Sequence, residues 1–216
     1  KNYFRDQHLY QKSKEIMNKL YPYLFYSLIL FMLNACTGRK ISATYYNEHS
    51  AALDSIEDSY QQLYQHHPFS IGFTDIHFKT VSVEILTDSL KYIYEFSVDE
   101  KRLPDSLERY GLNVAGTMAL IRNIQRIHCT WINKVNYYVD EKRHSMIFIS
   151  IKPVAVTAPF TYKKYYVLAY FRQPQYFDDQ GRLLDRRKRR RLRMINGDIF
   201  RRINDKVCYT ISGKFR

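Results

Sequence analysis

From Leu20 to Gly38 the chain carries no charged residue, and this run constrains the fold more than any other feature of the sequence. The run reads LYPYLFYSLILFMLNACTG and has no polar stripe, whereas a helix packed against the core of a domain normally has one. Its length lies between the apolar region of an export signal and a minimal membrane span. We therefore expect a targeting segment here, and we expect the folded domain to lie in the residues after it.

The residues at the two ends of this run suggest where the targeting segment begins and ends. Met17-Asn18-Lys19 gives it a short basic start, so we expect translation to begin at Met17 and residues 1–16 to be an upstream extension. The run closes with Leu33-Asn34-Ala35-Cys36, which resembles the lipobox of bacterial lipoproteins, although Asn34 replaces the usual small or hydroxyl residue. The resemblance implies that a signal peptide of residues 17–35 is removed and that Cys36 then carries fatty acids such as palmitate.

Two other interpretations of the run remain open, an uncleaved signal anchor and a buried core helix. Pro22 and the shortness of the aliphatic part argue against a lasting membrane span. Thr37 follows Cys36 where many lipoproteins retained in the inner membrane have Asp. The resemblance therefore implies a lipid-anchored protein of the cell envelope, in the outer membrane and facing the periplasm.

The composition of the chain allows one folded domain with a basic surface. Of the 216 residues 45% are hydrophobic and 16% aromatic, which is enough apolar material for one core. The first 35 residues contribute +3 to the net charge of +13, so residues 36–216 carry +10. A basic balance indicates anionic partners such as phospholipid headgroups, nucleic acid or other polyanions.

Apolar periodicity predicts an α+β domain over residues 47–216, after a short tether of residues 36–46. The main helix is expected at residues 113–132, with Asn113 as its cap and with His128 and Trp131 on its buried apolar face. The other expected elements are a helix at 47–65, a hairpin of 81–85 and 92–98, a short helix from 103, a hairpin of 135–140 and 145–151, and strands at 165–171 and 207–211. This order predicts a mainly antiparallel sheet with the two main helices packed on one face.

A dense run of cations near the C-terminus is the strongest chemical signal in the sequence. It consists of Arg186, Arg187, Lys188, Arg189, Arg190, Arg191 and Arg193. We predict an anion-binding surface here, and behind an export signal the natural counter-charge is an anionic lipid headgroup, at about 1 kcal/mol per cation. The alternative is a solvated charged surface, partly neutralised by nearby Asp178, Asp179, Asp185 and Asp198. Nucleic acid would be the expected partner in the cytoplasm, and the export signal argues against it.

Motifs for metals, cofactors and common catalytic centres are missing from the sequence. There is no HExxH, CxxC, GxGxxG, P-loop or GxSxG, so we predict no metal, no cofactor and no catalytic residue. His66, His67 and His77 lack a second cluster with ligand spacing. An oxidising compartment would permit a disulfide between Cys129 and Cys208. Cys208 is predicted on the polar side of its strand, so we do not expect the two thiols to meet.

These observations predict a membrane-tethered envelope lipoprotein with a non-enzymatic binding or structural domain. Its partners would be the membrane, reached through the lipid anchor, and an anionic lipid or another envelope component. One alternative is a lipid-anchored enzyme with an unrecognised site, which a deep pocket with converging polar groups would favour. Another is a nucleic-acid-binding protein that uses residues 186–193.

Overall fold

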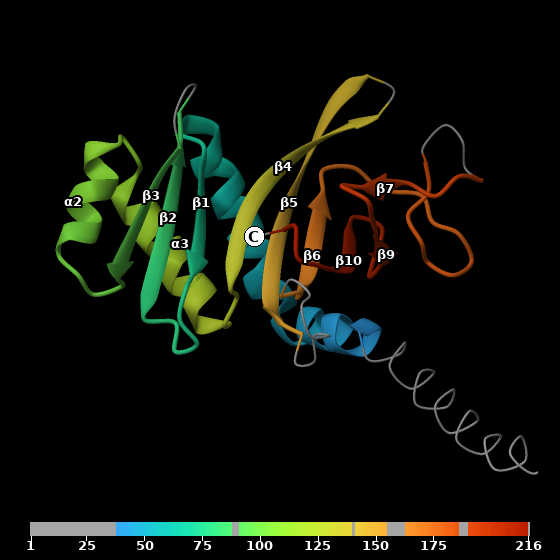
Figure 1. Cartoon of the computed structure of the whole chain (residues 1–216), viewed down its shortest axis with the longest axis horizontal. Coiled ribbons are helices and arrows are strands. Elements are labelled where there is room, and N and C mark those ends of the chain that lie inside the picture. The colour runs from blue at the N-terminus through green and yellow to red at the C-terminus, as the bar shows by residue number, and fades with distance from the viewer. Residues whose placement is uncertain (1–37, 88–90, 140, 155–162, 186–189, 216) are drawn as a thin grey trace, which may run out of the picture. The chain divides into compact units, whose positions relative to one another are not determined.

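The computed structural model describes residues 38–87, 91–139, 141–154, 163–185 and 190–215 (Figure 1). The chain divides into two compact units, residues 1–41 and 42–216, and only residues 38–41 of the first unit are described. Cys36 lies outside the described residues, as do Arg186, Arg187, Lys188 and Arg189.

The second unit is an α+β domain built on a large antiparallel sheet, as the sequence predicts. Among the described residues eight strands form this sheet, in the order β3-β2-β1-β4-β5-β6-β10-β9 (Figure 1). Their bounds are β1 Phe69–Phe73, β2 Thr80–Leu86, β3 Lys91–Ser97, β4 Trp131–Val139, β5 Lys142–Pro153, β6 Tyr165–Phe171, β9 Arg201–Arg202 and β10 Val207–Ser212. Two further short strands, β7 Met194–Ile195 and β8 Asp198–Ile199, pair with each other.

Both predicted hairpins and both predicted central strands are confirmed. β2 pairs with β3 and β4 pairs with β5, in each case antiparallel. Glu141 turns the second hairpin with φ 64°, in the left-handed region. β5 and β6 are central in the sheet, and every residue of Met146–Ile151 and of Tyr165–Phe171 is buried, which explains why these sequences are apolar on both faces.

The main helix is shorter than predicted. α3 runs over Val114–Arg126, and the predicted cap is confirmed, since the Asn113 side chain accepts a hydrogen bond of 2.9 Å from the Gly116 N–H. His128 ends the helix with φ 55°, and its N–H and that of Cys129 donate to Gln125 and Ile124 carbonyls. This is the Schellman pattern, which normally places Gly at the left-handed position.

The prediction that His128 and Trp131 lie on a helix face is therefore wrong. His128 is exposed beyond the helix and packs edge-on against Phe78, with ring centroids 5.0 Å apart. Trp131 is buried, as predicted, but it is the first residue of β4. The helical spacing continued past the true end because a buried strand begins soon after the helix and supplies apolar residues at similar intervals.

Trp131 packs across Gly72 of the neighbouring strand. The two residues are register partners in the β1–β4 ladder, and a Cβ atom at Gly72 would lie 1.6 Å from Cε3 of Trp131. Glycine is therefore required there to admit the indole ring. Trp131 belongs to a buried cluster with Met146, Phe148, Tyr165, Val167, Ala169, Phe171, Leu183, Ile195, Phe200, Cys208 and Phe215.

The final strand is largely buried on both faces, although Cys208 was predicted on its polar side. Cys208, Thr210 and Ser212 of β10 are buried, as are Val207 and Tyr209 on the other face, while Ile211 is 39% exposed. β10 lies between β6 and β9, and the segment of β8 supplies hydrogen-bond partners for its polar groups. The Thr210 hydroxyl donates to the Ile199 carbonyl at 3.0 Å, and the Ser212 hydroxyl donates to the Asp198 carboxylate at 2.6 Å. Satisfied hydroxyls can be buried at little cost.

Residues 42–66 of the second unit form a helix, called here the long helix, and the described residues 38–41 of the first unit are also helical. Residues 38–46, where we expected a tether, are helical. Within the second unit the long helix buries Leu53, Ile56 and Tyr60, and the Tyr60 hydroxyl donates to the Phe69 carbonyl at 2.5 Å. Among the described residues, no helix combines the length and apolarity needed to cross a membrane.

Candidate anion-binding pocket

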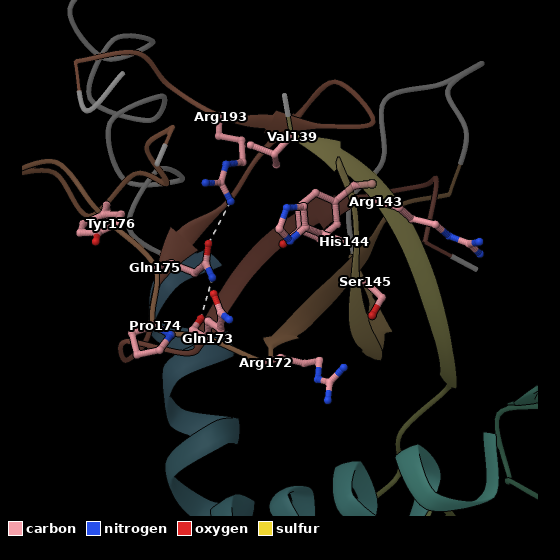
Figure 2. Close-up of a pocket in the computed structure, with 11 residues that line it drawn as sticks. Val139, Arg143, His144, Ser145, Arg172, Gln173, Pro174, Gln175, Tyr176 and Arg193 are labelled. Carbon is pink, nitrogen blue, oxygen red and sulfur yellow. Dashed lines mark hydrogen bonds between the residues drawn. The ribbon is translucent and has the colours of Figure 1, made fainter. Parts of the chain in front are cut away.

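The pocket shown in Figure 2 lies where β4 and β6 end and β5 begins, and it has a cavity volume of about 540 Å³. β4 and β5 contribute Tyr137 and His144, which are register partners in the hairpin. The segment after β6, from Arg172 to Tyr176, forms a second wall, and Arg193 closes the pocket from the C-terminal part of the chain. Three segments that are distant in the sequence therefore meet around one cavity.

Arg193 is the central residue of this pocket. Only 9% of its surface is exposed, although a guanidinium is normally solvated or paired with an acid. Its Nη1 donates to Oε1 of Gln175 at 2.9 Å, and Figure 2 shows the two side chains pointing toward each other. Its Nε is buried and has no hydrogen-bond partner within the described part of the chain. A buried N–H donor left without a partner costs roughly 1–3 kcal/mol.

The other charged groups around the pocket have the same sign as Arg193. Arg143 and Arg172 line it together with His144, and no Asp or Glu is among the described residues that line it. Arg143 extends from the rim in Figure 2. Several cations around a partly enclosed cavity create a positive potential there, because low-dielectric walls focus the field. The cavity is therefore electrostatically suited to an anion.

An aromatic wall gives the pocket an apolar side. The rings of Tyr137 and His144 are stacked, with centroids 5.6 Å apart and planes 22° apart, and the Tyr137 ring meets Phe171 edge-on at 6.0 Å. Burial raises the pKa of Tyr137, while the nearby Arg193 guanidinium opposes that rise. Tyr137 is therefore a neutral hydrogen-bonding group at physiological pH. The flat wall can contact the carbon skeleton of a ligand whose charged group meets the arginines.

The structure distributes the predicted cations over different environments. Arg193 enters the pocket, whereas Arg190 and Arg191 are exposed and do not line it. Sequence reasoning did not identify Arg143, His144, Arg172 or Gln175 as functional residues. Only the pairing of β4 with β5 and of β5 with β6 brings them near Arg193, and no local pattern in the sequence signals that proximity.

The pocket holds a histidine and a serine that are adjacent in the sequence. His144 and Ser145 both line it, but they are successive residues of a strand, whose side chains point to opposite faces, so they do not form a nucleophile and base pair. No cluster of three or more His, Cys, Asp or Glu residues that could hold a metal ion occurs in the described ranges.

The two predicted disulfide candidates, Cys129 and Cys208, are both buried free thiols. Burial raises the pKa of the Cys129 thiol to about 12, and the Tyr45 hydroxyl lies 3.0 Å from its sulfur. Burial also raises the pKa of Cys208. Since the thiolate is the reactive form, both thiols are inert at physiological pH.

Comparison with known proteins finds no matching family model, no similar curated protein and no similar solved structure.

Proposed function

We propose that this chain is a membrane-tethered lipoprotein of the cell envelope whose domain binds a phosphate-bearing ligand in the pocket of Figure 2, without catalysis. The observation that carries the proposal is the buried Arg193 side chain, which lines a cavity with no acidic residue among its described lining residues. Anchoring through Cys36 in the outer membrane, facing the periplasm, is the second part of the proposal, and it rests on the resemblance of residues 33–36 to a lipobox.

A phosphate group matches this pocket because it carries several acceptor oxygens around one centre. One oxygen can accept from the Arg193 guanidinium while others meet Arg172 and His144. Charge-assisted hydrogen bonds of this kind are about twice as strong as neutral ones, and guanidinium groups bind phosphate in a fixed planar geometry. The stacked Tyr137 and His144 rings would then contact the glycerol or sugar that carries the phosphate.

We propose a lipid or glycolipid headgroup as the source of that phosphate, because a lipid anchor would hold the domain beside such headgroups. The exposed Arg190 and Arg191 lie close in sequence to Arg193 and would add attraction to an anionic surface.

We also propose that the two main helices, the long helix and α3, pack on one face of the sheet. The hydrogen bond from Tyr60 to Phe69 supports contact between the long helix and β1.

Removing two pocket arginines should weaken phosphate binding much more than removing two arginines elsewhere. We expect an Arg143→Gln/Arg172→Gln variant of the full chain to bind inorganic phosphate or dihexanoyl phosphatidylglycerol about tenfold more weakly, which corresponds to about 1.4 kcal/mol. Calorimetric titration in neutral detergent measures this effect. Binding should also weaken as the Debye length falls from about 10 Å at 0.1 M salt to about 3 Å at 1 M.

Arg122→Gln/Arg126→Gln is the matched control, because both arginines are exposed on α3 and the change in net charge is the same. An equal loss of affinity in this control would show that only overall charge matters. Comparing the affinities for the two probes, inorganic phosphate and dihexanoyl phosphatidylglycerol, separates the sources of phosphate. Tighter binding of the phosphatidylglycerol than of inorganic phosphate supports a lipid headgroup, whereas equal affinities support a free phosphate group. No saturable binding of either probe would refute the pocket assignment.

Cys36→Ser should abolish lipid attachment. We expect mass spectrometry of the wild-type chain to find a mature N-terminus at acylated Cys36, and the variant to retain residues 17–35 without acylation. Partitioning between detergent and aqueous phases should be compared for the two proteins. An unmodified Cys36 in the wild-type protein, with equal partitioning of both proteins, would refute the lipoprotein proposal while leaving the pocket untouched.

A further inference from the structure

A second cavity of about 680 Å³ lies between the long helix and the segments that join β6 and β10 to their neighbours. Asp54, Glu57 and Asp58 of the long helix line it. Their spacing of three and four residues places them on one helix face, where like charges destabilise a helix. This concentration of carboxylates stands out in a chain with a net charge of +13.

A buried hydroxyl at the same cavity has no hydrogen-bond partner. Tyr170 lines the cavity and is 7% exposed, and its hydroxyl makes no hydrogen bond within the described ranges. Burial raises its pKa, and so do the neighbouring Tyr46 and Asp54. The hydroxyl is therefore a neutral group held among acids. The Tyr46 hydroxyl, on the same cavity, accepts a hydrogen bond of 3.0 Å from Asn204.

The carboxylates of this cavity are incompletely compensated. Burial, and the neighbouring Asp58 carboxylate, raise the pKa of both Asp54 and Glu57. Lys206 opposes the rise for Glu57, and Arg172 also lines the cavity, whereas Asp205 is already paired with Arg202 at 2.7 Å. Three carboxylates of the long helix thus share two nearby cations. A raised carboxyl pKa marks a site where the ionised form lacks favourable partners.

The spacing of the acids argues against a single metal ion. Among the described residues no three acidic, His or Cys side chains come close enough together to hold one. Carboxylates on successive turns of a helix instead match a ligand whose positive charges are spaced along a chain. The tyrosines and Phe171 add aromatic surface, which contacts methylene groups and attracts ammonium groups.

We propose that this acidic cavity, lined by Asp54, Glu57, Asp58 and Tyr170, binds a linear polyamine. The ammonium groups donate hydrogen bonds to the helix carboxylates, and the Tyr170 hydroxyl oxygen accepts a hydrogen bond from one of the remaining N–H groups. The methylene segments lie against Phe171 and Pro174. This site shares Arg172 and Pro174 with the anion-binding pocket, but its acids and Tyr170 do not line that pocket and its ligand has the opposite charge, so it does not depend on the proposed function.

Calorimetric titration of spermidine into the full chain in neutral detergent tests the proposal. We expect saturable binding, and we expect the Asp54→Asn/Glu57→Gln variant to bind at least about tenfold more weakly. Glu48→Gln/Asp99→Asn is the matched control, because both acids are exposed, neither lines the cavity, and the change in net charge is the same. The control should bind spermidine as the wild-type chain does.

Three outcomes would overturn the proposal: no saturable binding, an equal loss in the control, or displacement of spermidine by an equal concentration of Mg²⁺. Tyr170→Phe keeps the ring and removes only the hydroxyl, so it tests the site with little risk to folding. We expect it to weaken spermidine binding about threefold to tenfold, and unchanged affinity would remove Tyr170 from the site. Phosphate binding by the Asp54→Asn/Glu57→Gln variant should be unchanged, so failure of one site is distinguishable from failure of the other.

Discussion

Trp131→Ala is expected to lower the free energy of unfolding by about 3–5 kcal/mol, the range for truncating a large buried aromatic side chain. The indole is 5% exposed and fills the space over Gly72, which has no side chain of its own. Its loss would open a cavity in the cluster that also contains Phe148 and Phe215. Chemical denaturation of the wild-type and variant chains in neutral detergent measures the difference.

Two further variants separate the packing of Trp131 from the general effect of a mutation in β4. Tyr138→Ala alters the same strand at a side chain that is 71% exposed, and we expect a change within about 0.5 kcal/mol. Trp131→Phe keeps a ring over Gly72 and removes an indole N–H that is buried without a described partner, so its cost should be well below that of Ala. Similar losses for all three variants would contradict the packing described for Trp131.

Arg193→Met is expected to stabilise the domain and to abolish its response to phosphate. Replacing a buried charged group that lacks an acidic partner by an apolar side chain of similar length should raise the free energy of unfolding by about 1 kcal/mol. In the wild-type chain, phosphate at about 100 times its Kd should add about 2.7 kcal/mol, because the ligand binds only the folded state. The variant should show no such gain. Thermal unfolding with and without phosphate measures both effects.

Arg122→Met is the control for this experiment, since Arg122 is exposed on α3. It should leave both the stability and the phosphate response within about 0.5 kcal/mol of the wild-type values. A destabilised Arg193→Met variant would indicate that the guanidinium has a structural role, through Gln175, that outweighs its burial cost. A variant that keeps the full phosphate response would remove Arg193 from the binding site.

The sequence predicted the elements of the fold better than their ends and their environments. Alternation of apolar residues identified β2 and β3, and a continuous apolar run identified β5, because a strand with one buried face has apolar residues at every second position and a strand with two buried faces has them at consecutive positions. The end of α3 was missed because it depends on His128 adopting a left-handed conformation, which favours Gly and leaves no signal when His adopts it. The burial of Cys208 depends on β8 and β9 lying beside β10, and local sequence does not predict such tertiary contacts.

The candidate pocket was predictable only through Arg193. The run of cations at residues 186–193 is obvious in the sequence, but the sequence does not show which of these side chains is buried. Arg143 and Arg172 join the pocket because β5 pairs with both β4 and β6, and such pairings between strands cannot be inferred from local composition. The acids of the long helix are visible at helical spacing, but the Tyr170 hydroxyl beside them is not.

The short ladder between β1 and β4 has a consequence for how the chain folds. β1, β2 and β3 are joined by short connections, as are β4 and β5, so each set can form from local contacts. β1 and β4 meet through two described register pairs, Ile71 with Ile132 and Gly72 with Trp131, across a connection that includes β2, β3, α2 (Arg102–Arg109) and α3. Closing so long a loop costs entropy before any contact offsets it. We therefore expect the packing of Trp131 over Gly72 to be a late step in folding, in which two locally formed halves of the sheet become one cooperative unit.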